Sequence, residues 1–283
     1  MVLIDGKKVS AEVRVCLAKE VKELKEKTGR VPGLATVLVG NDPASAVYVR
    51  NKNKICRELG FKSFEQKLSL DTSEAKLLKL IKELNSNNDI HGILVQLPLP
   101  NQIDSEKILQ AIDPNKDVDG FHPINVGKLV VGNALLTPCT PSGIIKLLDH
   151  YEIDISGKHA VVLGRSNIVG KPVSMLLLQR NATITICHSR TKNLEEITRS
   201  ADILVAAIGR ANFVTENMVR KGAIVIDVGI NRVDGKLTGD INFEPVAKKA
   251  SYITPVPGGV GPMTIALLME NTLKAFKKSI DIN

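Results

Sequence analysis

The chain has 283 residues, 43% of them hydrophobic, and its 38 lysines and arginines against 30 acidic residues give a net charge of +8. This length is enough for one large domain or two ordinary ones. Tryptophan is absent and aromatic residues make up only 3%, which argues against an aromatic platform for stacking nucleic-acid bases. The lysines are scattered, so the charge indicates an anionic small molecule or a well-solvated surface rather than a nucleic-acid partner.

The cysteines and the N-terminal segment indicate a compartment. The four cysteines form no CxxC pair and no cluster with histidine; they are Cys16, Cys56, Cys139 and Cys187. This spacing fits a reducing cytoplasm and predicts no metal site. The first ten residues lack the apolar core of a signal peptide, and no apolar run could span a bilayer. We therefore expect a soluble cytoplasmic protein.

Short apolar segments alternate with amphipathic ones in the first hundred residues. The pattern predicts an opening helix, a strand over 34–40, helices over 48–60 and 73–84, and a strand over 90–97. Such alternation is typical of βαβ units with a mainly parallel sheet. The following segments, 98–102 and 113–129, are rich in Pro, Gly, Asn and Asp and are predicted to be loops.

The helix over 48–60 carries a lysine at an unusual position. Its apolar stripe is predicted to consist of Tyr48, Lys52, Ile55 and Leu59. A buried ammonium group is costly unless it is paired, and burial lowers the pKa of a lysine enough for acid–base work near neutrality. Tyr48, one turn earlier, directs a hydroxyl into the same space. The alternative is that Lys52 lies at the edge of the stripe and extends to water.

Further polar residues follow the strand over 90–97. Gln96 lies at its carboxyl end, the edge at which open α/β sheets bind ligands. The loop DVDGFH contains Asp117, Asp119 and His122, but too few further oxygen or imidazole ligands for a metal site. Later in the chain, the Pro/Gly segment over 253–264 opens a helix, which indicates close approach of the backbone to a ligand.

A second alternating series begins after residue 150. Strands are predicted over 158–164, 182–188, 201–209 and 222–229, with a helix from about 168 and a final helix over 264–283. We therefore predict an α/β protein with two α/β lobes around a cleft, the second a Rossmann-type domain. The predicted domains are 1–139, with the final helix packing back on it, and 140–263.

The segment VVLGRSNIVGKP, residues 161–172, reads as a strand, a glycine turn and a helix start. Such a turn brings backbone N–H groups and a helix N-terminus to a phosphate. Gly164 and Gly170 fit the dinucleotide fingerprint, whereas Ser166 stands in place of the middle glycine. The alternative is a purely structural corner between a strand and a helix.

The next predicted strand favours NADP over NAD. An NAD site usually carries a carboxylate about 20 residues after the glycine turn. Here the strand ends in CHSRTK, without a carboxylate. Ser189, Arg190 and Lys192, together with Arg165, could instead receive the 2′-phosphate of NADP.

Eight segments in this order resemble the bifunctional methylenetetrahydrofolate dehydrogenase/cyclohydrolase family, the FolD type. They are PASAVYVRNKNKICRELGF, VQLPLP, KDVDGFHPINVGKL, TPCTPSG, GRSNIVGKP, CHSRT, GAIVIDVGIN and ITPVPGGVGPMT. One departure is Ala211, where many relatives are expected to carry proline; it removes no catalytic group.

The resemblance implies roles for individual residues. Lys52 would be the central catalytic group, Tyr48 would position the folate, Gln96 would hydrogen-bond Lys52, and Asp119 would bind the aminopyrimidine edge of the pterin. The rest of the folate slot would be formed by Val95, Leu97, Pro257, Gly258, Gly259, Val260 and Gly261. NADP would be held by Gly164, Arg165, Ser166, Gly170, Ser189, Arg190 and Ile230.

The implied activity is NADP-dependent oxidation of 5,10-methylenetetrahydrofolate to the methenyl form, followed by hydrolysis to 10-formyltetrahydrofolate. The resemblance also implies a place in purine biosynthesis and a homodimer formed through the cofactor domain. Two alternatives remain open at this point. One is a different NADP-linked dehydrogenase of similar plan, such as a shikimate-type enzyme. The other is a basic nucleic-acid-binding or redox-sensing module.

Overall fold

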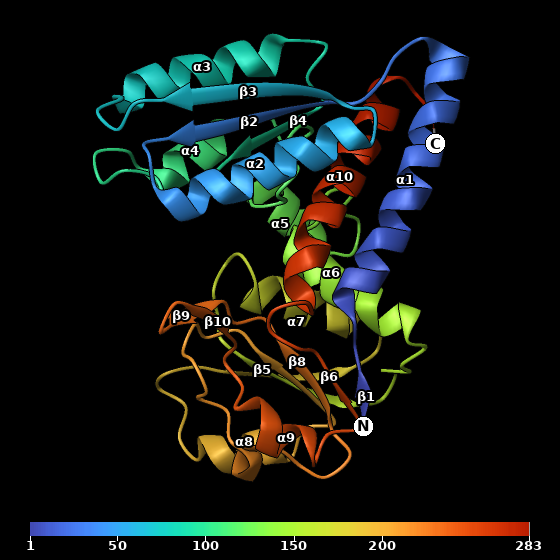
Figure 1. Cartoon of the computed structure of the whole chain (residues 1–283), viewed down its shortest axis with the longest axis vertical. Coiled ribbons are helices and arrows are strands. Elements are labelled where there is room, and N and C mark those ends of the chain that lie inside the picture. The colour runs from blue at the N-terminus through green and yellow to red at the C-terminus, as the bar shows by residue number, and fades with distance from the viewer. Residues whose placement is uncertain (283) are drawn as a thin grey trace. The chain divides into compact units, whose positions relative to one another are not determined.

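The computed structural model describes residues 1–282, apart from the side chain of Ala44, and divides into two compact units. The three-stranded unit comprises Glu12–Cys139 and the chain from Leu268 onward, and the six-stranded unit comprises Met1–Ala11 and Thr140–Leu267. The division falls within two long helices, α1 (Gly6–Thr28) and α10 (Val260–Ser279), drawn in blue and red in Figure 1.

The three-stranded unit is built on a parallel sheet of order β3-β2-β4. Its strands are β2 (Gly33–Val39), β3 (Lys62–Leu68) and β4 (Gly92–Val95). Every residue of β2 is buried, as expected of a central strand covered on both faces. One face packs on α3 (Glu74–Ser86) and α4 (Ser105–Ala111). The other is covered by α2 (Pro43–Glu58), and Figure 1 shows α2 and α3 on opposite sides of the sheet.

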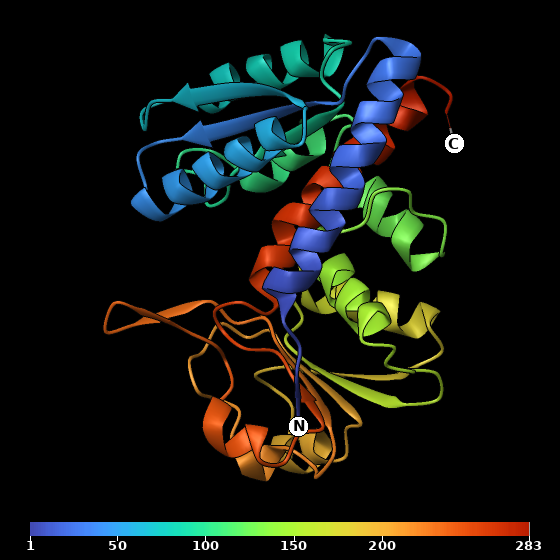
Figure 2. The same cartoon turned by 45° about the vertical axis from the view of Figure 1, so that its right-hand side comes forward.

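The C-terminal part of α10 belongs to this same unit. It runs beside α1 in Figures 1 and 2, and Lys277 Nζ lies 3.0 Å from Glu20 Oε1. Phe276 is fully buried and packs edge-on against His91, with ring centroids 4.8 Å apart. The final helix starts at Val260, four residues before the predicted start.

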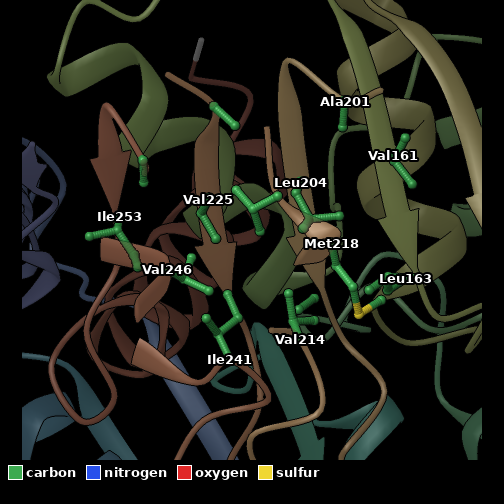
Figure 3. Close-up of a cluster of buried hydrophobic side chains, with 14 of the residues drawn as sticks. Val161, Leu163, Ala201, Leu204, Val214, Met218, Val225, Ile241, Val246 and Ile253 are labelled. Carbon is green, nitrogen blue, oxygen red and sulfur yellow. The ribbon is translucent and has the colours of Figure 1, made fainter. Parts of the chain in front are cut away.

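The six-stranded unit contains a fully parallel sheet of order β1-β11-β8-β7-β5-β6. The strands are β1 (Val2–Leu3), β5 (His159–Leu163), β6 (Thr183–Cys187), β7 (Ile203–Ala206), β8 (Ile224–Asp227) and β11 (Tyr252–Ile253). The helices are α6 (Cys139–His150), α7 (Gly170–Gln179), α8 (Leu194–Arg199), α9 (Phe243–Ala247) and the 3₁₀ turn η1 (Glu216–Met218). Helix α7 lies on one face of the sheet, and α8 and α9 lie on the other in Figure 1. The apolar cluster drawn in Figure 3 includes Val246 of α9 and packs against Leu194 and Ile197 of α8.

An antiparallel hairpin extends from this unit. It pairs β9 (Asn231–Val233) with β10 (Lys236–Thr238), and Figure 2 shows it projecting away from the sheet. Asp234 and Gly235 form its turn with φ values of 48° and 76°. Asp-Gly is the sequence expected where a two-residue hairpin turn needs two positive φ angles.

Among the differences from the sequence predictions, three have a clear physical cause. Residues 1–11 group with the six-stranded unit rather than with 12–139, because β1 pairs in parallel with β11. Strand β3 was not predicted, because this edge strand alternates exposed and half-buried positions and carries several charges. Helix α5 (Pro123–Val130) occupies a segment predicted to be a loop. It forms because His122 Nδ1 accepts from Ile124 N at 3.1 Å and Pro123 supplies the first helical residue.

Within residues 1–282, no helix is both long and apolar enough to cross a bilayer.

Candidate active site

Helix α2 presents Tyr48 and Lys52 on adjoining turns of the three-stranded unit. The helix starts where the Asp42 carboxylate accepts a 2.7 Å hydrogen bond from Ser45 N and Pro43 follows the cap. This is the expected chemistry of a helix start. The Tyr48 side chain is 40% exposed, whereas Lys52 is half-buried.

The buried face of α2 is not the predicted stripe. The stripe predicted to be buried was Tyr48, Lys52, Ile55 and Leu59, of which only Leu59 is buried. The residues that are buried ahead of it are Ser45, Val49, Asn53 and Cys56. Two of these are polar: Ser45 donates its backbone N–H to Asp42, and Asn53 Oδ1 accepts from Thr36 Oγ1 of β2 at 2.8 Å, whereas Asn53 Nδ2 has no partner among the described residues. Lys52 therefore lies beside the buried face, and its ammonium group is partly accessible.

Lys52 is hydrogen-bonded to an amide rather than to a carboxylate. Its Nζ donates to Gln96 Oε1 at 3.0 Å. Gln96 follows β4 directly, and its Nε2 donates to the Leu97 carbonyl at 2.7 Å, which fixes the orientation of the amide. The acceptor is neutral, so this hydrogen bond orients the amine without placing a carboxylate oxygen in contact with it.

Of the polar residues in the loop DVDGFH, two stabilise the backbone. The buried Asp117 carboxylate accepts from His122 N at 2.8 Å and from Asn125 Nδ2 at 2.9 Å. His122 caps α5 with Nδ1, and its Nε2 lies 3.2 Å from the Gln110 carbonyl. Both residues are therefore engaged in holding the start of α5. Within residues 1–282 no cluster of three or more His, Cys, Asp or Glu residues could hold a metal ion.

Asp119, in contrast, has a carboxylate that no described residue hydrogen-bonds. Burial raises its pKa to about 6, the positive charge of Lys52 opposes this shift, and the negative charge of Asp117 adds to it. A half-buried carboxylate with a raised pKa and no hydrogen-bond donor among the described residues is available to a ligand with N–H groups. The adjacent Gly120 has φ +71°, and a Cβ there would lie 2.6 Å from Pro138 N, so the turn requires glycine.

Asn271 of α10 holds this turn in place. Its Nδ2 donates to the Val118 carbonyl at 2.9 Å and to the Thr137 carbonyl at 2.8 Å, and the side chain is fully buried. Cys139 lies beside it, with Sγ 3.3 Å from the same Val118 carbonyl. Burial raises the pKa of the Cys139 thiol well above 9, and the Asp119 charge adds to this. Sequence reasoning missed Asn271, because nothing in its local pattern distinguishes it from a surface asparagine.

We expect Asn271→Leu to lower the free energy of unfolding by about 2–4 kcal/mol, since the buried carbonyls of Val118 and Thr137 lose the amide donor. Urea denaturation followed by circular dichroism measures this. The matched control is Asn51→Leu at an exposed position of α2, which should stay within about 0.5 kcal/mol of the parent. Equal stability of Asn271→Leu and the parent would contradict this assignment of Asn271.

The predicted apolar wall and the Pro/Gly loop belong to different units. Val95 is buried in β4 and Leu97 is half-buried, both in the three-stranded unit. The loop Pro257–Gly261 belongs to the six-stranded unit, where the Gly258 carbonyl accepts from Lys7 N at 3.1 Å. Gly258 has φ +112°, so a side chain would be strained at this position.

In the six-stranded unit, the chain leaves β5 through a turn that has no space for side chains. Gly164 has φ +118°, and a Cβ there would lie 2.2 Å from the Ala207 carbonyl. A Cβ at Gly170 would lie 2.2 Å from the Gly164 carbonyl. Ser166, in place of the middle glycine, accepts from Val169 N and Gly170 N, each at 3.2 Å, and so caps α7. This turn brings α7 close to β5, as a phosphate-binding corner requires.

A cavity of about 330 Å³ lies beside this turn. Four predicted cofactor residues line it: Gly164, Arg165, Ser166 and Ser189. The lining contains two arginines and no carboxylate, which matches a phosphate-bearing ligand. No described residue accepts a hydrogen bond from the N–H groups of residues 165–168, which leaves them available to an anion.

The other predicted cofactor residues do not line this cavity. They are Gly170, which shapes the turn, and Arg190 and Ile230, which are exposed. The cavity adds lining residues that sequence reasoning missed: His188, Leu194, Ala207, Ile208, Arg210 and Phe213. Arg210 stacks over the Phe213 ring, 4.5 Å from its centroid. In the segment IGRANFV, Ala211 is the departure from the family pattern, whereas Arg210 directly before it lines the cavity.

Two family descriptions match most of the chain. Residues 4–119 match the catalytic domain of tetrahydrofolate dehydrogenase/cyclohydrolase, and residues 138–280 match its NAD(P)-binding domain. The chain is 56% identical over 279 residues to the bifunctional protein FolD of Streptococcus mutans, covering 98% of each protein.

Solved structures agree with these matches. The bifunctional FolD dehydrogenase/cyclohydrolase of Campylobacter jejuni superposes with a TM-score of 0.96 at 52% identity, covering 98% of this chain and 99% of that one. The Trypanosoma brucei FolD, solved with NADP and an inhibitor, gives a TM-score of 0.95 at 41% identity, covering 99% of this chain and 98% of that one.

Proposed function

Since the chain belongs to the tetrahydrofolate dehydrogenase/cyclohydrolase family, it is a bifunctional enzyme of folate one-carbon metabolism, and we propose how its residues divide the two reactions. The enzyme oxidises 5,10-methylenetetrahydrofolate to the methenyl form with NADP and hydrolyses that product to 10-formyltetrahydrofolate. Membership in this family sets aside the shikimate-type and nucleic-acid-binding alternatives.

The dehydrogenase reaction depends on binding and alignment. A hydride leaves the one-carbon bridge of the substrate, which becomes the methenyl cation, and NADP supplies the acceptor for that hydride. Asp119 binds the aminopyrimidine edge of the pterin, because that edge is rich in N–H groups and no described residue donates a hydrogen bond to this carboxylate. Tyr48 and the half-buried Leu97 position the folate on the three-stranded unit, with Val95 buried behind them in β4. The Pro257–Gly261 loop belongs to the six-stranded unit, and its contact with the folate stays a prediction of the family resemblance.

The cyclohydrolase reaction needs a proton acceptor. Water adds to the methenyl carbon and gives up a proton, and the ring then opens as the departing nitrogen gains one. The Lys52 amine accepts the proton from water and can return a proton to the leaving nitrogen. The observation that supports this assignment is the hydrogen bond from Lys52 Nζ to the neutral Gln96 oxygen, which orients the amine.

The cofactor cavity is suited to the 2′-phosphate end of NADP. Arg165 and Ser189 line it together with the glycine turn, and Arg210 adds a second guanidinium group. The 330 Å³ volume is within the range of small-molecule sites and corresponds to part of a dinucleotide. We assign the residues that form this cavity to NADP binding, with Gly170 shaping the turn and Arg190 and Ile230 outside the cavity lining.

The direct test is a spectrophotometric assay with 5,10-methylenetetrahydrofolate and either NADP⁺ or NAD⁺, followed by decay of the methenyl form without cofactor. Turnover with NADP⁺ and rapid methenyl loss are the expected results. Preference for NAD⁺ would contradict the assignment of the arginine-lined cavity, and the absence of turnover with either cofactor would contradict the proposed function.

Arg165→Gln is expected to lower kcat/KM for NADP⁺ by at least about tenfold and to change that for NAD⁺ little, because a charge-assisted contact with the 2′-phosphate is lost. Steady-state kinetics with both cofactors measure the ratio. Arg190→Gln is the matched control, since Arg190 is exposed and outside the cavity lining. A larger loss of NADP⁺ selectivity in Arg190→Gln than in Arg165→Gln would overturn this placement.

Compartment and assembly complete the proposal. We infer that the enzyme acts in the cytoplasm as a homodimer formed through the six-stranded unit, and that its product supplies one-carbon units for purine biosynthesis. The four cysteines are all free thiols, which supports a reducing compartment. Light scattering should give twice the mass of one chain, and a monomer at micromolar concentration would contradict the dimer.

A further inference from the structure

The buried carboxylate of Asp240, in the six-stranded unit, accepts hydrogen bonds from the backbone of the loop that follows β7. Asp240 Oδ2 accepts from Ile208 N at 2.7 Å and from Gly209 N at 3.0 Å, and Oδ1 accepts from Arg210 N at 2.8 Å. Oδ1 also accepts from Asn231 Nδ2 of the β9–β10 hairpin at 3.0 Å. Asp240 is fully buried, so these four donors compensate a charge that water cannot reach.

A second buried carboxylate fixes Asp240 itself. Asp227, at the end of β8, accepts from Asp240 N at 2.9 Å through Oδ1 and from Ile241 N at 3.0 Å through Oδ2. Glycines allow the two acids to pack this closely: a Cβ at Gly229 would lie 2.3 Å from Asp240 Oδ1, and one at Gly239 would lie 1.9 Å from Asp227 Oδ2. Burial raises the pKa of Asp227 to about 6, although these N–H donors oppose the shift. The Asp240 carboxylate therefore has one rigid position.

The loop that Asp240 holds is one side of the cofactor cavity. Ala207, Ile208 and Arg210 line the cavity, and their neighbour Gly209 has φ +67° and is exposed. A glycine loop with exposed residues would be mobile without an anchor. Three consecutive N–H groups bound to one carboxylate supply that anchor and fix the backbone from which Ile208 and Arg210 reach the cavity.

We propose that Asp240 is a positioning residue for the dehydrogenase reaction, which holds residues 208–210 in the shape that receives NADP before the cofactor arrives. Asp240 touches neither substrate nor cofactor, and it acts through the backbone of its loop. This proposal rests on the assignment of the cavity to NADP. Preorganisation of this kind lowers the cost of ordering a loop on binding, so its loss raises KM more than it lowers kcat.

The test is Asp240→Asn, which keeps the side-chain volume but turns an N–H₂ group toward N–H donors. We expect KM for NADP⁺ to rise about tenfold, with kcat for hydride transfer within about threefold of the parent. The cyclohydrolase rate, assayed without cofactor, should stay within about twofold, because Lys52, Gln96 and Asp119 belong to the other unit. The matched control is Asp234→Asn, an exposed aspartate at the hairpin tip, which should leave all three values unchanged.

An unchanged KM for NADP⁺ in Asp240→Asn overturns the inference. Arg165→Gln, assayed alongside, shows whether the cavity assignment itself survives, so the two failures are distinguishable. If Asp240→Asn loses the cyclohydrolase rate through misfolding, amide hydrogen exchange of the parent enzyme without cofactor decides. Protection of the 208–210 amides supports the proposal, and exchange at the rate of free amides contradicts it.

Discussion

Replacement of Lys52 by methionine is expected to lower the cyclohydrolase rate by about 10²–10⁴-fold, the usual contribution of a positioned proton acceptor. Methionine retains the unbranched apolar chain, so the change removes the amine and its hydrogen bond to Gln96. Hydride transfer should retain a measurable fraction of its rate, since that reaction needs alignment rather than a proton acceptor. Methenyl decay without cofactor and NADPH formation measure the two activities separately.

The control for this variant lies two residues along the same helix. Lys54→Met removes an exposed amine, whose Nζ lies 3.8 Å from Glu58 Oε1, and should leave both rates within about twofold of the parent. A Lys52→Met enzyme that hydrolyses the methenyl compound at the parent rate would falsify the assignment of Lys52.

Asp119→Asn is expected to lower kcat/KM for the folate substrate by about a hundredfold or more in both reactions, because charge-assisted hydrogen bonds to the pterin are replaced by weaker ones. The amide also directs N–H donors toward the donors of the ligand. Both activities should fall together, which distinguishes a binding carboxylate from a group that acts in one reaction alone. Loss of the cyclohydrolase rate alone, with an unchanged KM for methylenetetrahydrofolate, would contradict this role.

The same substitution is expected to stabilise the fold at neutral pH. The folded pKa of Asp119, about 6, lies above its ordinary value of 3.8, because burial penalises the carboxylate. Its favourable contribution is therefore full below pH 4 and is lost as the pH rises through 6. Asparagine is neutral throughout, so the variant should gain about 1–2 kcal/mol over the parent above pH 6, after allowance for partial solvent access, and little at pH 4.

Thermal unfolding of parent and variant at pH 4.5 and pH 8 measures this difference. Asp71→Asn is the contrasting control, because a side-chain hydrogen bond with Ser69 lowers the pKa of that exposed carboxyl. Asp71→Asn should therefore give no gain at pH 8. A variant Asp119→Asn less stable than the parent at pH 8 would show that the carboxylate is compensated within the fold.

The alternation of apolar and amphipathic segments was sufficient to predict the central strands of both sheets. It failed where residues were stabilised by distant partners. Strand β3 carries charges because it lies at a sheet edge, and β1 has only two residues whose partner, β11, lies at the far end of the chain. Helix α5 has only eight residues and includes a glycine, and its start depends on a histidine cap that no periodicity reveals.

The candidate site could also be predicted only in part from the sequence. The helical periodicity predicted that Lys52 lies on the buried face of α2, whereas it lies at the edge of that face. The prediction was wrong because the fold buries two polar residues, Ser45 and Asn53, which periodicity assigns to the surface. The roles of Gln96 and Asp119 came from the family resemblance. Asn271 and Asp240 could not have been found from sequence, since their partners are backbone groups far away along the chain.

The position of Asn271 has a consequence for synthesis of the protein. The amide that holds the Asp119 turn comes 132 residues after Cys139, and at ribosomal rates that interval takes roughly 7–26 s. A nascent chain that has released the whole segment up to Cys139 still lacks the donor for the Val118 and Thr137 carbonyls. The turn that carries Asp119 therefore gains these two hydrogen bonds only when translation is nearly complete, and we expect a chain stalled on the ribosome before α10 to bind folate more weakly than the full chain.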